Sequence, residues 1–321
     1  MQEKYRLMKK IIGFGNSLVD ILVRLDSDST LLEMGLKKGA MQLVDKDYPL
    51  CSLGEDVRVI KAPGGSAANT MKALAHEGVD AAFIGKVADD ENGRFFTTAL
   101  RNEGVNTDSV ALVAQGTTGT ATTFVSPDGE RTFATCLGVS GTLQAADIRP
   151  QALDPYDILY VEGYLVQNHD LIERAMQEAN RRGMQVALDL ASYNVVEQER
   201  AFFAYLVDEY VDILFANPEE ATAFTQLPPR EAVASLAGEV ALAVVKLGAD
   251  GAVAQMGDEL VSRPAQNVEH VVDTTGAGDF FAAGFLAEYI KGKDLAHCLD
   301  RGAALAAEVI QVMGTTIKYN H

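Results

Sequence analysis

The sequence has little positive charge. It contains 27 lysines and arginines against 45 aspartates and glutamates, which gives a formal net charge of −18 over 321 residues. Because binding to a phosphate backbone or an anionic membrane draws on a surplus of basic side chains, this balance argues against a nucleic-acid partner and a membrane partner. An anionic substrate would need a local positive site.

Cysteine is also scarce. Cys51, Cys136 and Cys298 are odd in number and widely spaced, and no Cys-x-x-Cys pair occurs. Neither a disulfide framework nor a zinc site is indicated, and a reducing compartment fits best. The five histidines show no metal-ligand spacing either; they are His76, His169, His270, His297 and His321.

Long apolar runs are absent. No segment approaches the roughly 18 to 20 apolar residues that a membrane-spanning helix needs. The apolar stretch after the basic residues of 1–10 is interrupted by Gly13, Gly15, Asn16 and Asp20, and no small-residue cleavage site follows it. We therefore expect neither a membrane segment nor a signal peptide, and a cytoplasmic location.

Strand-like and helix-like patterns alternate along most of the chain. Residues 157–161 form a short apolar run, 170–182 have helical spacing, and 185–190 are strand-like again. The pattern repeats with the apolar runs 211–215 and 240–247. Such alternation is typical of parallel strands joined by covering helices. We predict an α/β fold with a doubly wound, mostly parallel sheet and helices on both faces.

Two segments depart from this alternation. Residues of about 13–50 and 109–136 lack long helical patterns, and the second segment contains β-branched runs around a hairpin turn with Asp128-Gly129 at its tip. We predict that they form a small β-rich lid on the α/β body. Because its pieces are separated in sequence, the lid would be a discontinuous part of a single domain over 1–321.

The strongest motif is Asp273-Thr274-Thr275-Gly276-Ala277-Gly278-Asp279, before a helical pattern that runs to about residue 290. The small residues let the amides of Gly276, Ala277 and Gly278 converge at a helix N-terminus, where they can hold a phosphate group. Asp279 lies at the mouth of this helix, where a carboxylate could accept a proton from a hydroxyl that attacks phosphorus. A loop with a capping aspartate explains the same residues without catalysis.

Residues suited to binding hydroxyl groups occur twice near the N-terminus. Gly64 and Gly65 allow close approach of a ligand and precede a helical pattern with Asn69, which offers donors and an acceptor. Asn16 and Asp20 follow an apolar run whose glycines invite a dinucleotide-binding interpretation, but the third glycine of that motif is missing. Tight turns explain both groups equally well.

A further group follows two later strand patterns. Asn217 and Glu220 begin a helix, where a carboxylate can organise water on Mg²⁺, although simple helix capping explains them as well. Lys246, Gly248 and Gly251 form a turn that leaves space for a nucleotide. No Gly-x-x-x-x-Gly-Lys-Ser/Thr loop occurs, so the common nucleotide-triphosphatase class is not indicated.

Together these motifs resemble the ribokinase-like, or PfkB carbohydrate kinase, family. Residues 64–69 are similar to its N-terminal signature, 273–279 to its C-terminal signature, and Asn217-x-x-Glu220 to its magnesium and phosphate motif, in the same order. The likeness extends from about residue 10 to 319. Four segments resemble the adenosine kinase branch more than ribokinase or fructokinase: 15–20, 38–41, 128–131 and 211–217.

The resemblance implies a kinase that uses ATP and Mg²⁺ to phosphorylate a primary hydroxymethyl group. Asp279 would be the catalytic base, and the amides of residues 276–278 would stabilise the transferring phosphoryl group. Asn217 and Glu220 would organise Mg²⁺ through water. The nucleotide would lie beside Lys246, Gly248 and Gly251.

Other positions follow from the same resemblance. Asp273 and Thr275 match positions that often bind a monovalent cation such as K⁺, together with backbone carbonyls near 313–316. Arg131 would reach the phosphates or the acceptor when the lid closes. A homodimer paired through the lid strands is one expected assembly, because an exposed sheet edge invites pairing.

The acceptor is expected to be a nucleoside, with adenosine first, or a sugar such as ribose or fructose. A ribose ring presents similar hydroxyl groups in both, and a sensor without catalytic activity is a further alternative. Phe133 and Phe14 are candidates for contact with a purine. The residues that would hold the acceptor are Asn16, Asp20, Gly64, Gly65, Asn69 and Arg131.

Overall fold

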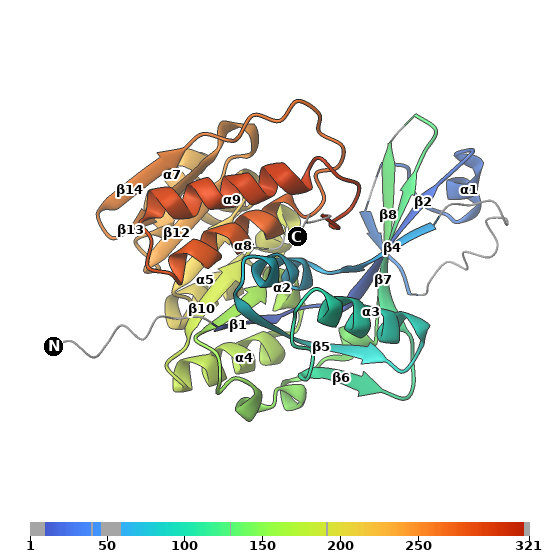
Figure 1. Cartoon of the computed structure of the whole chain (residues 1–321), viewed down its shortest axis with the longest axis horizontal. Coiled ribbons are helices and arrows are strands. Elements are labelled where there is room, and N and C mark those ends of the chain that lie inside the picture. Colours follow the sequence, from blue (N-terminus) through green and yellow to red (C-terminus); the bar gives the residue numbers. More distant parts are fainter. Residues whose placement is uncertain (1–9, 40, 46–58, 129, 191, 318–321) are drawn as a thin grey trace.

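The computed structural model describes residues 10–39, 41–45, 59–128, 130–190 and 192–317, and the strands of this part of the chain form two sheets (Figure 1). The large sheet has nine strands in the order β14-β13-β12-β11-β10-β9-β1-β5-β6, and the small sheet has five in the order β3-β8-β7-β2-β4. Figure 1 shows the small sheet standing at one end of the body.

The elements have the following bounds. The strands of the large sheet are β1 (Lys10–Phe14), β5 (Asp80–Ala88), β6 (Val110–Val113), β9 (Ile158–Glu162), β10 (Gln185–Asp189), β11 (Ile213–Ala216), β12 (Leu242–Lys246), β13 (Ala252–Met256) and β14 (Glu259–Arg263). The strands of the small sheet are β2 (Leu18–Arg24), β3 (Met41–Leu43), β4 (Val59–Gly64), β7 (Thr118–Val125) and β8 (Arg131–Gly138). The helices are α1 (Ser29–Glu33), α2 (Ser66–His76), α3 (Glu91–Asn102), α4 (His169–Arg181), α5 (Tyr193–Tyr210), α6 (Pro218–Thr225), α7 (Pro229–Leu236), α8 (Ala277–Tyr289) and α9 (Leu295–Val309).

The predicted α/β architecture is confirmed. Strands from β6 to β12 pair in parallel, and only β13 and β14 are antiparallel among the described strands of this sheet. Successive buried residues of a strand point to opposite faces. Ile11 therefore packs with α2, α8 and α9 on one face, whereas Ile12 packs with α4, α5 and α7 on the other. These strands are buried on both sides, which explains their nearly continuous apolar sequence.

The small sheet differs from the predicted lid at its margins. Residues 13–14 belong to β1, which pairs with β5 and β9 at the centre of the large sheet. Residues 110–113 form β6, which extends the large sheet beside β5. By contrast β4, which lies beyond the predicted boundary at 50, pairs antiparallel with β2 in the small sheet. Residues 46–50 and Gly129 at the predicted hairpin tip lie outside the described residues.

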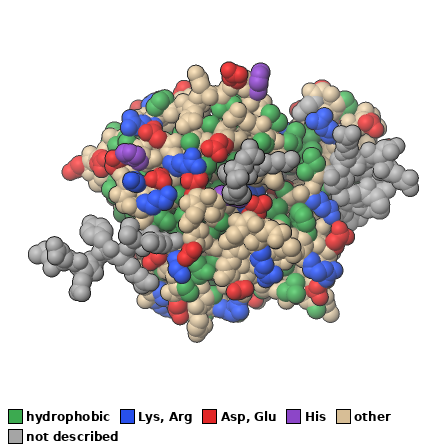
Figure 2. Space-filling view, in the orientation of Figure 1, with side chains coloured by type: hydrophobic (Ala, Val, Ile, Leu, Met, Phe, Trp, Pro, Cys, Tyr) green, Lys and Arg blue, Asp and Glu red, His purple; other side chains and the backbone are tan. Residues whose placement is uncertain are grey.

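Basic and acidic side chains are mixed on one face of the molecule. On the face drawn in Figure 2, lysines and arginines of the described residues lie scattered among aspartates and glutamates. No helix within the described part of the chain is both long enough and apolar enough to cross a membrane.

Candidate active site

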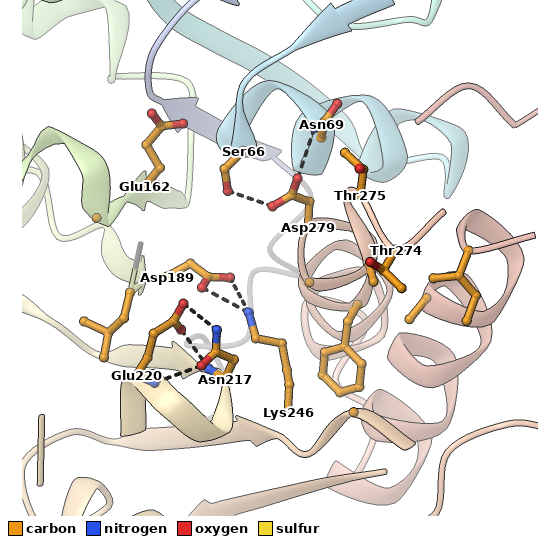
Figure 3. A pocket seen from close by; sticks show the side chains of 18 of the residues that line it. Ser66, Asn69, Glu162, Asp189, Asn217, Glu220, Lys246, Thr274, Thr275 and Asp279 are labelled. Carbon is orange, nitrogen blue, oxygen red and sulfur yellow. Dashed lines mark hydrogen bonds and ion pairs between the residues drawn. The ribbon is translucent and has the colours of Figure 1, made fainter. Parts of the chain in front are cut away.

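The parallel strands of the large sheet end at one cavity of about 1250 Å³. Glu162 and Asp189 are the last residues of β9 and β10, Asn217 directly follows β11, and Lys246 ends β12; all four line the cavity (Figure 3). Ligands of open α/β sheets bind outside the carboxyl ends of the strands. This cavity is therefore the candidate active site.

Most of the residues singled out from the sequence meet here. Gly64, Arg131, Asp273 and Gly276 do not appear among the described residues that line the cavity. Those that do are Asn16, Asp20, Gly65, Asn69, Asn217, Glu220, Lys246, Gly248, Gly251, Thr275, Ala277, Gly278 and Asp279.

Asp279 lies in the first turn of α8 and is held by two side chains of α2. Ser66 Oγ donates to Asp279 Oδ1 at 2.7 Å, and Asn69 Nδ2 donates to Oδ2 at 3.0 Å (Figure 3). Burial raises the pKa of Asp279 to about 6, although both hydrogen bonds act in the opposite direction. The carboxylate is thus ionised at neutral pH but more basic than an ordinary aspartate, which suits a general base.

The loop before Asp279 borders the cavity through Thr275, Ala277 and Gly278. Gly276 has φ of 77°, a left-handed conformation that favours glycine, and a Cβ atom there would lie 2.6 Å from Thr315 Cγ2. Within the described residues, the amides of Gly276 and Gly278 donate to no acceptor, whereas Ala277 N donates to Thr274 O at 3.2 Å. Free amides at a helix N-terminus form an anion-binding site.

Lys246 lies beside the amides of residues 276–278, which we call the anion hole. A Cβ atom on Gly278 would be 3.2 Å from Lys246 Nζ. Asp189 holds the ammonium group, with its two carboxylate oxygens at 3.0 and 2.9 Å from Nζ. Burial disfavours the charge, but Asp189 and Glu220 outweigh it and raise the pKa of Lys246. Lys246 is therefore a positively charged side chain on the cavity wall, held there by Asp189.

Asn217 and Glu220 form a capping box at the start of α6. Asn217 Oδ1 accepts from Glu220 N at 2.8 Å, and Glu220 Oε2 accepts from Asn217 N at 2.8 Å. The side chains also meet, because Asn217 Nδ2 donates to Glu220 Oε1 at 2.7 Å. Burial raises the pKa of Glu220 to about 8, against the effect of Lys246. The capping interpretation is correct, and it places a buried carboxylate on the cavity wall.

Magnesium fits this wall only together with a phosphate ligand. No group of three or more His, Cys, Asp or Glu within the described residues could hold a metal ion. Both Glu220 oxygens already accept hydrogen bonds from Asn217. Because Mg²⁺ keeps several waters and commonly binds one or two carboxylates plus substrate phosphates, Glu220 fits a contact through water.

Sequence reasoning missed Glu162 and Asp189. Glu162 is 2% exposed; its Oε1 accepts from Asn16 N at 2.8 Å and from Asn16 Nδ2 at 2.7 Å, and its Oε2 accepts from Ala67 N at 3.0 Å. Burial raises the pKa of Glu162 to about 7, although these bonds lower it. Gly15 leaves the necessary room, because a Cβ atom there would lie 2.2 Å from Glu162 Oε2. The sequence contained one signal that could have identified both residues, because each is an acidic residue at the end of an apolar strand.

Asn16 and Asp20 border the cavity from the side of the small sheet. Besides Glu162, Asn16 contacts Ser140, whose Oγ donates to Asn16 Oδ1 at 3.3 Å. Asp20 lies on β2 against Gly64, where a Cβ atom would be 2.0 Å from Asp20 Oδ1. Burial raises the pKa of Asp20 to about 7 despite Lys72. Gly64 thus makes room for an acid instead of lining the cavity.

Asn69 links Asp279 to the C-terminal loop. Its Oδ1 accepts from Thr315 Oγ1 at 3.0 Å, and Thr315 Oγ1 accepts from Lys72 Nζ at 2.9 Å. Because these contacts orient the Asn69 amide, its Nδ2 group is directed at Asp279. The same residue that was predicted to bind hydroxyl groups therefore also positions the candidate base.

Arg131 and Asp273 lie together outside the cavity. Arg131 Nη1 donates to Asp273 Oδ1, and Nη2 donates to the backbone oxygen of Val272 at 3.2 Å. Asp273 also accepts from Thr275 N and Gly314 N, both at 2.9 Å. A monovalent cation prefers converging oxygen ligands. With the Arg131 guanidinium group against Asp273 Oδ1, such a cation does not fit here, and Arg131 contacts Asp273 instead of a phosphate.

The small sheet contributes an apolar wall. Leu18 and Asp20 share one face of β2, and Thr135 and Leu137 of β8 lie on the same face of the small sheet. Ala121 and Leu43 complete this wall. Phe133 precedes Thr135 by two residues and so points to the same side of β8, but it is not among the lining residues described. Phe14 is 0% exposed in the core, so a contact between Phe14 and a purine is excluded.

Comparison with known proteins identifies relatives of two substrate types. The family described as pfkB family carbohydrate kinase matches residues 40–321. The crystal structure of adenosine kinase from Sinorhizobium meliloti superposes with a TM-score of 0.85 and 36% identity, covering 96% of this chain and 95% of the other. An uncharacterised sugar kinase of Archaeoglobus fulgidus is 31% identical over 75% of this chain and 95% of its own length. An ATP-dependent ribose-1-phosphate kinase of Halopiger xanaduensis is 33% identical over 76% of this chain and 79% of its own length.

Proposed function

The chain belongs to the pfkB family of carbohydrate kinases, and we propose that it transfers the γ-phosphoryl group of ATP to the primary hydroxymethyl group of a nucleoside, adenosine first, to give AMP. The observation that carries the choice of acceptor is the composition of the cavity beside the candidate base. Polar groups able to bind a ribose line it together with apolar side chains of the small sheet.

The apolar wall favours a nucleoside over a free sugar. A free sugar carries hydroxyl groups around its ring, and each one buried against leucine would lose a hydrogen bond to water. A nucleoside offers ribose hydroxyls at one end and a flat base at the other. Asn16 and Asp20 suit the ribose, whereas Leu18, Ala121 and Leu137 suit the base. The similarity to an adenosine kinase structure supports the same choice.

Asp279 would begin the reaction. Its carboxylate would accept the proton of the acceptor hydroxymethyl group as that oxygen attacks the γ-phosphorus. Ser66 and Asn69 hold the carboxylate in place, so little rearrangement is needed before proton transfer. Burial keeps the base strong enough for this task at neutral pH.

The anion hole and Lys246 would stabilise the developing charge. The free amides of Gly276 and Gly278 would bind the transferring phosphoryl group, and Lys246 Nζ lies next to Gly278. Mg²⁺, when bound with ATP, would neutralise phosphate charge, and Glu220 would orient its water. Gly248 and Gly251 would leave space for the nucleotide along the same cavity.

A sugar is the second candidate acceptor. Asn16, Asp20, Gly65 and Asn69 would hold the hydroxyl groups of a free furanose as well as those of a nucleoside. The sequence similarity to two sugar kinases favours this alternative.

An acceptor screen with purified protein and Mg-ATP separates the candidates. The panel contains adenosine, inosine, guanosine, ribose, fructose and 2-keto-3-deoxygluconate, and the phosphorylated product is quantified for each. We expect the largest kcat/KM for adenosine. Replacing Leu137 by aspartate should lower kcat/KM for adenosine more than for ribose, because the charge would face the base. Turnover of sugars alone would overturn the nucleoside assignment.

A further inference from the structure

Arg131 connects the small sheet to the loop that precedes α8. It is the first residue of β8, and its guanidinium group contacts Asp273 and the backbone oxygen of Val272. The Asp273 side chain is 2% exposed and the Arg131 side chain 22%. The pair is thus largely withdrawn from water, where an ion pair interacts more strongly than at an open surface.

N–H donors surround the Asp273 carboxylate on both sides. Oδ1 accepts from Thr275 N and Arg131, and Oδ2 accepts from Gly314 N. Burial alone would raise the pKa of Asp273, but these donors lower it, so the group is a carboxylate. Its single negative charge is already matched by one guanidinium group. The environment is that of an anion bound by the protein, and a metal cation placed beside Oδ1 would meet the guanidinium group of Arg131.

The segments joined by this ion pair support the anion hole. Gly314 is followed by Thr315, whose methyl group packs against Gly276, as the 2.6 Å approach to an added Cβ atom indicates. Thr315 Oγ1 donates to Asn69 Oδ1, and Asn69 in turn donates to Asp279. A displacement of this loop would therefore disturb both the anion hole and the candidate base.

We propose that Arg131 is a built-in cation that takes the place of the monovalent ion implied by the family resemblance. It neutralises Asp273 and fixes the loops at 272–275 and 313–315 behind the anion hole. Because the charge is part of β8, the order of these loops depends on the position of the small sheet instead of on the surrounding salt. Arg131 is thus a positioning residue that acts on the anion hole through Asp273. The inference rests on the proposed phosphoryl transfer.

Salt substitution with three variants tests the proposal. Arg131→Met removes the charge, Arg131→Lys keeps it, and Arg94→Met is a matched control, since Arg94 is 64% exposed and pairs with Asp89 at the surface. Steady-state kcat and KM are measured in KCl, NaCl and tetramethylammonium chloride, each at about 0.1 M so that screening is equal. We expect wild type and Arg94→Met to vary by less than about twofold among the salts.

Arg131→Met should behave differently. In tetramethylammonium chloride its kcat should fall about 10- to 100-fold, because the anion hole loses its alignment. K⁺ can enter the vacated space and should raise the kcat of Arg131→Met several-fold above its value in tetramethylammonium chloride. Arg131→Lys should need no K⁺. Stimulation of the wild type by K⁺ of about fivefold or more would overturn the proposal, as would an Arg131→Met variant with the salt response of the wild type.

A readout without substrate separates this inference from the proposed function. The unfolding temperature of each protein is compared in KCl and tetramethylammonium chloride. A K⁺-specific increase in Arg131→Met alone supports the inference even if no tested acceptor is phosphorylated. An equal K⁺-specific increase in the wild type, or none in Arg131→Met, contradicts it.

Discussion

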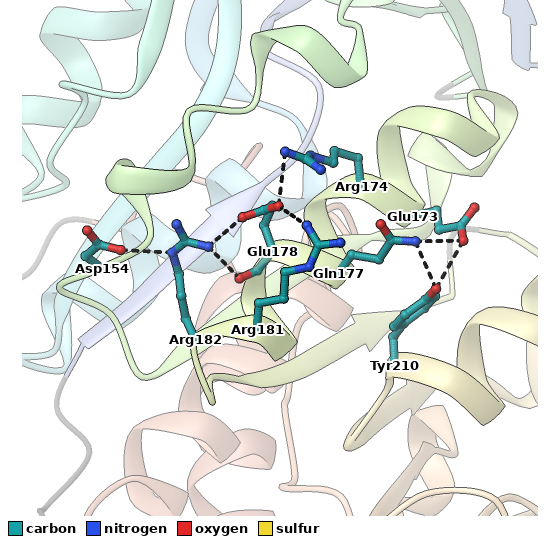
Figure 4. A network of polar contacts seen from close by, with 8 residues as sticks. All are labelled: Asp154, Glu173, Arg174, Gln177, Glu178, Arg181, Arg182 and Tyr210. Carbon is teal, nitrogen blue, oxygen red and sulfur yellow. Dashed lines mark hydrogen bonds and ion pairs between the residues drawn. The ribbon is translucent and has the colours of Figure 1, made fainter.

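Two groups of buried acidic side chains in this molecule differ in how far basic side chains compensate their negative charge. On α4, the side chain of Glu178 is 6% exposed and contacts Arg174, Arg181 and Arg182, at 3.0, 2.6 and 2.6 Å (Figure 4). Although burial works against it, the guanidinium groups lower the pKa of Glu178. Here the bases outnumber the acid, so the carboxylate is ionised and the helix is stabilised.

The acids of the cavity show the reverse. Burial raises the pKa to about 7 for Asp20, about 7 for Glu162, about 8 for Glu220 and about 6 for Asp279. Lys72 and Lys246 are too few to compensate. A buried acid that lacks matching bases reduces stability at neutral pH but can exchange a proton in the working range. The difference between the clusters is thus the difference between a structural ion network and the candidate active site.

The largest effect should come from neutralising the candidate base. Asp279→Asn should lower kcat about 10²- to 10⁴-fold, since general-base catalysis is lost, and should leave the KM for ATP within a few-fold. The unfolding temperature should not fall, because a disfavoured charge is removed. Asp89→Asn, at an exposed aspartate, is the control and should retain activity. An Asp279→Asn enzyme that retains wild-type turnover would refute the assignment.

The matching change on α4 should affect stability alone. Glu178→Gln removes the acid that three arginines share, although Arg182 keeps Asp154. We expect a loss of about 1–2 kcal/mol in the free energy of unfolding, because the partly exposed arginines weaken each ion pair. Denaturant unfolding measures this loss, and kcat should stay unchanged. Glu91→Gln, at a side chain that is 90% exposed, should cost almost nothing. An equal effect at both positions would remove the contrast between the clusters.

A smaller effect concerns stability and pH. In the folded protein the cavity acids have pKa values above their ordinary values of 3.8 and 4.5. Their contribution to the free energy of unfolding is therefore complete below about pH 4 and is lost as the pH rises through 6 to 8. Lys72, whose pKa burial lowers to about 8, acts in the opposite sense only near and above that pH. The unfolding temperature should therefore be higher at pH 6 than at pH 8, by a few degrees.

Calorimetry of Glu162→Gln provides the control for this pH dependence. The amide cannot titrate, so the difference in unfolding temperature between pH 6 and pH 8 should shrink. A wild-type protein that becomes steadily more stable from pH 6 to pH 8 would show that the cavity acids do not have raised pKa values.

The sequence was sufficient for the fold class and for the motifs with conspicuous local chemistry. The helix predicted over 170–182 is α4 (His169–Arg181), and the loop before α8 adopts at Gly276 the left-handed conformation that a glycine permits. The lid margins were wrong at β4 and β6, because pairing partners that are distant in sequence decide which sheet a short strand joins.

The remaining site residues depend on tertiary contacts. Glu162 and Asp189 become functional candidates only when neighbouring strands end at one cavity. The contact between Arg131 and Asp273 spans 142 residues and depends on how the small sheet meets the body. No local pattern specifies such a contact, so only the structure reveals that Arg131 faces the loop that was expected to bind a cation.

The ratio of kcat for the wild type to kcat for Asp279→Asn, measured from pH 5 to pH 8 with the preferred acceptor and saturating Mg-ATP, tests the central claim most directly. The ratio removes the ionisation of ATP itself, which both enzymes share. It should be constant above about pH 6 and fall roughly tenfold per unit below that value, as the Asp279 carboxylate takes up a proton. A ratio that stays constant down to pH 5 would contradict the claim that Asp279 is the base whose strength is set by burial.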